Sequence, residues 1–202
     1  QVFTAASKTT AIYGSNFTVL TISTTGHTAR QPLVMDVYTP DGDTETARPL
    51  IIYCHTGNFL PWVNPVTGLS VNQACGGLRT DPAAVEICTN LAKMGYVVAS
   101  IDYRLGWRPD LLDELQRRFT LINATYRGVQ DVRTCIRYFR KTVAEQGNPF
   151  KIDPNRICVY GQGTGGYLSL NTAALDQYSE ILNTSEPGKF TINGFPMIIE
   201  AY

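Results

Sequence analysis

The feature that most constrains the fold is a series of short, continuously apolar runs separated by stretches with helical spacing. Each run is too short for a typical helix, and none alternates polar with apolar residues. Each is therefore expected to be a strand buried on both faces. Such strands alternating with helices predict an α/β fold with a mostly parallel, doubly wound sheet. The four runs lie at residues 50–54, 96–101, 157–159 and 195–199.

Helical signals fill the intervals between these runs. Asp81 followed by Pro82 predicts a helix start, and Gly95 predicts its end. A shorter apolar repeat over residues 111–119 predicts a separate short helix, which we interpret as core-facing rather than as a cap over a pocket. The segment 165–175 is expected to be helical. The clearest helical periodicity, with spacings of 3 and 4, is formed by Val129, Val132, Ile136, Phe139 and Val143.

Upstream of the first apolar run, two segments rich in β-branched residues predict an antiparallel hairpin. They cover residues 17–23 and 33–38, and Gly26 and Pro32 mark the turn between them. No internal repeat and no linker divides the sequence. We therefore expect residues 1–202 to form a single domain.

Charge and hydropathy narrow the function classes. The 202 residues carry 17 basic and 17 acidic side chains, so the net charge is zero and nucleic-acid binding is disfavoured. No run of eighteen apolar residues is present, so no transmembrane segment is expected. The charged fraction is only 17%, and the chain begins at Gln1 either because a leader has been removed or because the sequence is trimmed. We favour a secreted, periplasmic or cell-surface protein.

The cysteines and histidines predict no metal site. No C-x-x-C pair occurs, and the chain has only two histidines. Cys54 and Cys158 lie in apolar runs and are expected to be small buried side chains. In an oxidising compartment, Cys75 in a glycine-rich loop is expected to pair with Cys88. The five cysteines are Cys54, Cys75, Cys88, Cys135 and Cys158.

Two loops follow the carboxyl ends of expected strands, where open α/β sheets place their ligands. They span residues 54–58 and 160–166. In the second loop, Gly161, Gly163 and Gly166 match the G-x-G-x-x-G pattern of dinucleotide sites. However, the pattern lies late in the chain and no acidic residue follows at a strand end. Nucleotide binding is thus the third hypothesis, and no cofactor is expected.

Four motifs, in order along the chain, are typical of one family. They are DVYTP at 36–40, RPLIIYCH at 48–55, DYRLG at 102–106 and DPNRI at 153–157. With these motifs the sequence resembles the α/β-hydrolases, in particular the carboxylesterase and hormone-sensitive-lipase-like branch. The resemblance covers roughly residues 17–176. It implies an α/β-hydrolase core with carboxylic ester hydrolysis as the family activity.

The resemblance also implies a nucleophile elbow, G-x-S-x-G, in which a serine stands on a strained strand-to-helix turn. Gly161 and Gly165 align with the elbow glycines, and Gly163 occupies the position of the nucleophile. Glycine has no nucleophilic group. The hydroxyl of Thr164, one residue later, could act as a displaced nucleophile. We favour the interpretation that Thr164 caps the start of the helix or packs there.

The oxyanion loop departs from the family as well. The family often has His-Gly-Gly, whereas this chain has His55, Thr56 and Gly57. The resemblance leaves the backbone N–H groups of Gly57 and Asn58, together with that of Thr164, as oxyanion-like donors. His55 is interpreted as a structural residue of this loop.

The other members of a triad are not found. In the family they follow the seventh and eighth strands, whereas six strands are expected here and the remaining histidine, His27, lies in the hairpin turn. We therefore expect a fold incomplete at its C-terminus, whose last strand edge is covered by a further segment or a protein partner.

The leading hypothesis is a catalytically degenerate esterase-like protein that acts as an extracytoplasmic binding or assembly component. Its expected ligand is a neutral small molecule or ester-like compound. The second hypothesis is an active carboxylesterase whose nucleophile has been mutated or displaced to Thr164.

Overall fold

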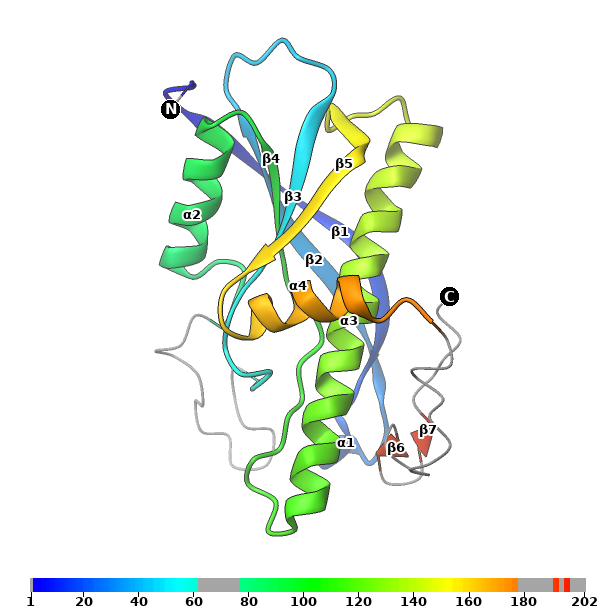
Figure 1. Ribbon diagram of the computed structural model, residues 1–202. Coiled ribbons are helices and arrows are strands. Elements are labelled where there is room, and N and C mark those ends of the chain that lie inside the picture. Colours follow the sequence, from blue (N-terminus) through cyan, green and yellow to red (C-terminus); the bar gives the residue numbers. More distant parts are fainter. Residues whose placement is uncertain (1, 62–76, 178–190, 193–194, 197–202) are drawn as a thin grey trace.

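The computed structural model describes residues 2–61, 77–177, 191–192 and 195–196 (Figure 1). The elements in chain order are β1 (Ala6–Thr18), α1 (Ile22–Thr25), β2 (Ala29–Pro40), β3 (Arg48–Cys54), α2 (Pro82–Lys93), β4 (Val97–Ile101), α3 (Glu114–Glu145), β5 (Ile152–Gly161), α4 (Thr164–Ala174), β6 (Thr191–Ile192) and β7 (Phe195–Pro196).

The first five strands form one sheet in the order β1-β2-β4-β3-β5. β1 pairs antiparallel with β2, and β2 pairs antiparallel with β4. β3 pairs in parallel with both β4 and β5. The prediction of a mostly parallel sheet was therefore too strong, because the hairpin joins the parallel part directly and half of the pairings are antiparallel.

Helices cover both faces of this sheet, with α2 on one face and α3 and α4 on the other (Figure 1). The inner strand β3 contributes side chains to both of the interfaces between the sheet and the helices. Ile51 and Tyr53 pack in the cluster of α2, whereas Leu50, Ile52 and Cys54 pack in the cluster of α3 and α4. Alternate side chains of a strand point to opposite faces, so a continuously apolar run was correctly interpreted as a strand buried on both sides.

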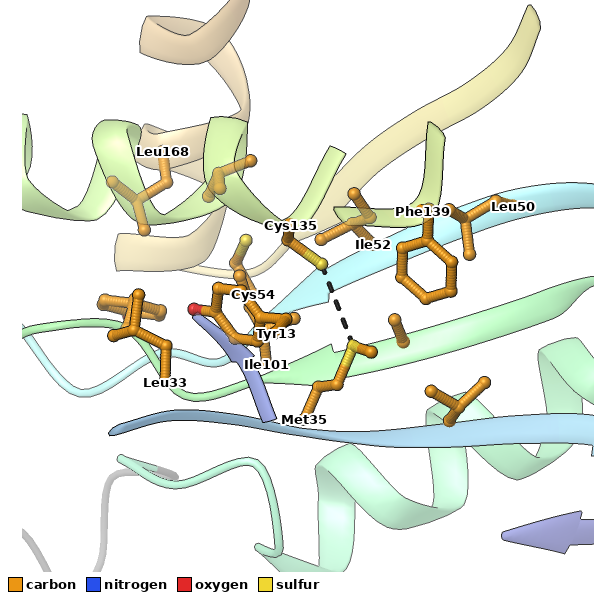
Figure 2. Packing of buried hydrophobic residues seen from close by; sticks show 14 of the residues in the cluster. Tyr13, Leu33, Met35, Leu50, Ile52, Cys54, Ile101, Cys135, Phe139 and Leu168 are labelled. Atoms are coloured by element: carbon orange, nitrogen blue, oxygen red, sulfur yellow. Dashed lines mark hydrogen bonds between the residues drawn. The ribbon is translucent and has the colours of Figure 1, made fainter. Parts of the chain in front are cut away.

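The larger core cluster lies between the sheet and α3 (Figure 2). Met35 from β2 and Ile52 from β3 face Cys135 and Phe139 from α3, and the Cys135 Sγ atom lies 4.0 Å from the Met35 Sδ atom. The 3-and-4 spacing predicted this apolar stripe of α3 correctly, since Val132 and Phe139 are fully buried.

The hairpin exists, but its first strand lies further upstream than predicted. β1 ends at Thr18, and the end of the expected strand 17–23 instead enters the one-turn helix α1, which spans residues 22–25. Most of the first residues of β1 are exposed and polar. This strand therefore lacks the apolar pattern by which strands are found in a sequence.

The predicted separate helix over residues 111–119 is wrong. A single helix of 32 residues, α3, begins at Glu114 and includes the periodic segment 129–143. Leu112, which was expected to face the core, precedes the helix and is 99% exposed. The helix continues through Gly128 because this position packs against α4, where an added Cβ would lie 2.7 Å from Leu168.

The last two predicted strands differ from expectation. Residues 157–159 do belong to a strand, β5, but it lies at an edge of the described sheet and exposes Cys158, which was predicted to be buried. Phe195 and Pro196 form β7, which pairs antiparallel with β6 in a separate two-stranded sheet. The rest of the predicted strand 195–199 lies outside the described residues.

The predicted Cys75–Cys88 disulfide is not seen. Cys75 lies outside the described residues, and Cys88 is a buried free thiol on the face of α2 that meets the sheet. Burial raises the pKa of Cys88 to about 12. Within the described ranges, no helix is long and apolar enough to cross a membrane, and no three His, Cys, Asp or Glu side chains are grouped to hold a metal ion.

Candidate functional site

The glycine-rich turn between β5 and α4 is a sharp elbow. β5 ends at Gly161 and α4 begins at Thr164, and Gly163 between them has φ 54° and ψ −117°. Residues with a side chain rarely adopt this conformation. The Gly163 carbonyl accepts a hydrogen bond from the Tyr167 N–H at 3.0 Å, which starts the helix. The turn thus has the sharp strand-to-helix geometry that presents a nucleophile in hydrolases, and glycine adopts it at little cost.

Two further glycines allow the elbow to close on the end of β3. A Cβ atom on Gly161 would lie 2.6 Å from the Cys54 carbonyl oxygen, and a Cβ atom on Gly165 would overlap the same oxygen. The contacts are with backbone atoms, which cannot rotate away. The structure therefore places Gly161 and Gly165 where no other residue fits.

The loop after β3 is also held in an unusual conformation. Gly57, Asn58 and Phe59 all have positive φ angles, of 112°, 57° and 55°. Such a conformation costs on the order of 1–3 kcal/mol for a residue with a side chain. Surrounding contacts compensate for this cost, since the Phe59 carbonyl accepts hydrogen bonds from the N–H groups of Gly106 and Trp107 at 2.9 and 3.1 Å.

The structure brings the two loops together at Asn58 and Thr164. The Asn58 N–H donates a hydrogen bond of 2.7 Å to the Thr164 hydroxyl oxygen. Two of the three predicted oxyanion-like residues are therefore neighbours. The Asn58 N–H is nevertheless already bound within the protein, so it does not face the cavity as a spare donor. Thr164 itself is only 7% exposed and stands at the start of α4.

His55 has the surroundings of a structural residue. It is buried, its ring stacks on that of Tyr103 with the centroids 4.3 Å apart, and its Nδ1 donates to the Thr56 carbonyl at 2.7 Å. Burial lowers the pKa of His55 below its ordinary value. The other histidine, His27, follows α1 in the hairpin turn, where its carbonyl accepts hydrogen bonds from two threonine hydroxyls.

A buried ion pair anchors the loop that follows β4. Arg104 donates to both carboxylate oxygens of Asp131 on α3, at 2.9 Å each from its Nε, and both residues are almost completely buried. A second guanidinium, Arg127, lies beside them, and burial together with Arg104 lowers its pKa to about 9. The pair connects the 102–106 motif to the long helix, and this loop in turn supports Phe59.

A cavity of about 550 Å³ opens beside the elbow. Its walls come from the loops after β3 and β4, from α3 and from α4, and none of the lining side chains among the described residues is charged. They are mostly aromatic and aliphatic, with a few hydroxyl and amide groups. The lining residues are Asn58, Phe59, Trp107, Leu121, Ile122, Thr125, Tyr126, Gly163, Thr164, Tyr167, Asn171 and Leu175.

Sequence reasoning missed the wall that α3 contributes. Leu121, Ile122, Thr125 and Tyr126 belong to the part of α3 that was expected to lie between two helices. One signal was available: no proline interrupts residues 114–145, so the two apolar repeats could have been joined. The contribution of Trp107 has no comparable signal in the sequence.

Comparison with known proteins yields one family and several distant structures. The BD-FAE family model matches residues 35–195, which is more than half of the chain. No curated protein matches the chain. Among solved structures, the chain is similar to a hyperthermophilic esterase from the archaeon Pyrobaculum calidifontis, with 22% identity and a TM-score of 0.48 over 90% of this chain and 41% of that one.

A thermophilic esterase from the planctomycete Thermogutta terrifontis is similar at 20% identity and a TM-score of 0.45, covering 81% of this chain and 42% of that one. The same esterase phosphorylated by paraoxon has 21% identity and a TM-score of 0.47, with 81% and 46% covered. The chain thus spans less than half the length of these solved structures.

Proposed function

The chain belongs to the BD-FAE family, which places it among the esterase-like α/β-hydrolases, and from this premise we propose that it is a catalytically degenerate member. In this proposal the chain binds a ligand beside its elbow and does not hydrolyse it.

The observation that carries the proposal is the backbone of Gly163. This residue keeps the positive φ of an elbow, yet it offers no side chain at the point of attack. Removing the serine of a catalytic triad costs about a million-fold in turnover in a well-studied protease. The sequence supplies only two histidines, and the imidazole of His55 is enclosed against Tyr103. A general base at the elbow is therefore not provided by either described histidine ring.

The chemistry of the cavity supports a neutral ligand. The described part of its lining holds no charged side chain, and the whole chain has a net charge of zero. Aromatic and aliphatic walls with a few hydroxyl and amide groups suit a small neutral molecule that carries hydrogen-bonding oxygens. We propose an ester-like compound, which such a protein retains because it is not cleaved.

The low charged fraction of 17% supports a location outside the cytoplasm. In that location the protein acts as a binding or assembly component, and a protein partner or a further segment covers the edge of the last strand of the sheet. Nucleic acid is not among the proposed partners.

The test of the proposal is an ester panel on the natural full-length protein, with p-nitrophenyl acetate and p-nitrophenyl butyrate. The expected rate equals that of the buffer. Turnover well above this background, abolished by a fluorophosphonate serine-hydrolase probe, would show that the protein is an active hydrolase.

The alternative function, an active esterase with Thr164 as nucleophile, has one observation in its favour. The Thr164 side chain lines the cavity, and its hydroxyl oxygen accepts from the Asn58 N–H while no described group accepts its proton. Intact mass after fluorophosphonate treatment decides between the two functions. An adduct mapped to Thr164 supports the alternative, whereas an unmodified mass supports binding without hydrolysis.

A further inference from the structure

The two departures from the hydrolase motifs, Thr56 and Gly163, lie against each other although 107 positions separate them along the chain. A Cβ atom built on Gly163 would overlap the Thr56 hydroxyl oxygen and would lie 3.4 Å from the Thr56 Cβ atom. The Thr56 side chain thus occupies the space into which a residue at the elbow would project.

We propose that Thr56 and Gly163 form a compensating pair, in which the Thr56 side chain fills the space of the missing nucleophile and prevents its return by a single substitution. The inference rests on the proposed function, because it assumes that the elbow once carried a side chain. According to this proposal, the absence of the nucleophile involves two positions, 56 and 163, and not position 163 alone.

The size of the two side chains supports the pair. Where the family resembled by this sequence often has a small Gly, the chain has Thr56, and where that family has Ser, the chain has Gly163. One position has gained a side chain and the other has lost one. Exchanges that conserve total volume in a packed site are tolerated better than single insertions.

The surroundings of Thr56 prevent it from moving away easily. Its carbonyl accepts from the buried His55 ring, and Asn58 two residues later is bonded to Thr164. Because threonine is β-branched, rotation about its Cα–Cβ bond leaves a single staggered position in which neither heavy atom points at residue 163. A side chain at position 163 is therefore compatible with only one of the three Thr56 rotamers, so it is expected to be disfavoured as long as Thr56 is present.

The experiment is a double-mutant cycle in thermal unfolding of the whole chain, with Gly163→Ser, Thr56→Gly and the double variant. The matched control is Gly147→Ser, since Gly147 also has a positive φ, of 69°, but nothing lies within 4 Å of an added Cβ. This control measures the backbone cost alone, which is expected to lower Tm by about 2–4 °C.

The expected result is that Gly163→Ser lowers Tm by roughly twice the control or more when Thr56 is present. In the Thr56→Gly background it is expected to cost no more than the control. Thr56→Val keeps the bulk of the side chain and is expected to give no relief. If Gly163→Ser does not fold, Gly163→Ala adds only the Cβ atom and shows the same rescue.

Equal losses of Tm in the Thr56 and Thr56→Gly backgrounds would overturn the pair. This outcome would not change the interpretation of the ester panel, because the ester panel tests the proposed binding function independently of the mutant cycle. Conversely, ester turnover by the unmodified protein would overturn the proposed function while the coupling between Thr56 and Gly163 is still measured.

Discussion

The strands β3 and β5 each end in one loop of the candidate site, and they differ in burial although both contain a short apolar run. Residues 50–54 of β3 are buried in an inner strand of the sheet, whereas β5 lies at the edge of the described sheet, with Cys158 exposed and Tyr160 39% exposed. A short apolar run therefore indicates a strand, but it does not indicate whether one or both faces of that strand are buried by the rest of the chain.

The loops that follow these strands differ in a related way. After β3, the positive φ angles fall partly on Asn58 and Phe59, which carry side chains, and both of these line the cavity. After β5, the positive φ falls on Gly163, where it costs little. The conformational strain is thus kept on the wall that would contact a ligand and is absent from the position of the nucleophile.

The largest effect is expected from Gly165→Ala, which tests how closely the elbow packs on β3. The added Cβ overlaps the Cys54 carbonyl oxygen, so we expect a loss of about 3–5 kcal/mol in the free energy of unfolding. Urea denaturation measures it. The control Gly147→Ala, in open space at positive φ, is expected to lose about 1 kcal/mol; equal losses would contradict the packing described.

The second prediction compares β3 with β5 by an isoleucine-to-alanine substitution in each strand. Ile52→Ala in β3 removes a completely buried side chain and is expected to cost about 3–5 kcal/mol. Ile157→Ala in β5 removes a half-buried one and is expected to cost about 1–2 kcal/mol. If the two urea midpoints shift equally, β5 is covered in solution as fully as β3.

A smaller effect is expected from Thr164→Val, which removes the acceptor of the Asn58 N–H. Leaving this donor without its partner is expected to cost about 1–3 kcal/mol of unfolding free energy. Thr164→Ser keeps the hydroxyl and serves as the control. A valine variant as stable as the serine variant would mean that the contact between the two loops contributes nothing.

The smallest perturbation is chemical modification of the thiols in the native protein at pH 8. Burial raises the pKa of Cys54 and Cys135, so their thiolate fraction is negligible, whereas Cys158 is exposed. Among the four described cysteines, iodoacetamide is expected to modify Cys158 first, as followed by peptide mass mapping. Labelling of Cys54 as fast as Cys158 would contradict the difference in burial between the two strands.

Much of the parallel part of the fold was predictable because local signals and burial agree there. The apolar run at 50–54, the start at Pro82 and the stripe through Val132 all mark elements that the structure contains. β1 was misplaced because its outward residues are polar, and α3 was divided because its middle is lined by polar residues that are nonetheless buried. Thr125 and Asp131 are examples of this polar burial.

The site was predictable only in part. The sequence motifs predicted that the loops after β3 and β5 form the site. In the structure these two loops meet where the Asn58 N–H donates to the Thr164 hydroxyl. The contact between Thr56 and Gly163 depends on side-chain direction across two strand ends, which spacing along the chain does not encode. The same holds for the part of the cavity wall that Trp107 forms.

The most direct test of the central claim, that this site binds without hydrolysing, is to incubate the full-length protein with a neutral p-nitrophenyl ester and follow two quantities. These are the Tm of the protein and the amount of intact ester by mass spectrometry. We predict that Tm rises while the ester stays intact, and that Ile122→Trp, which fills the cavity, abolishes the rise. Consumption of the ester by the unmodified protein, or an unchanged Tm at saturating ester, would contradict the account.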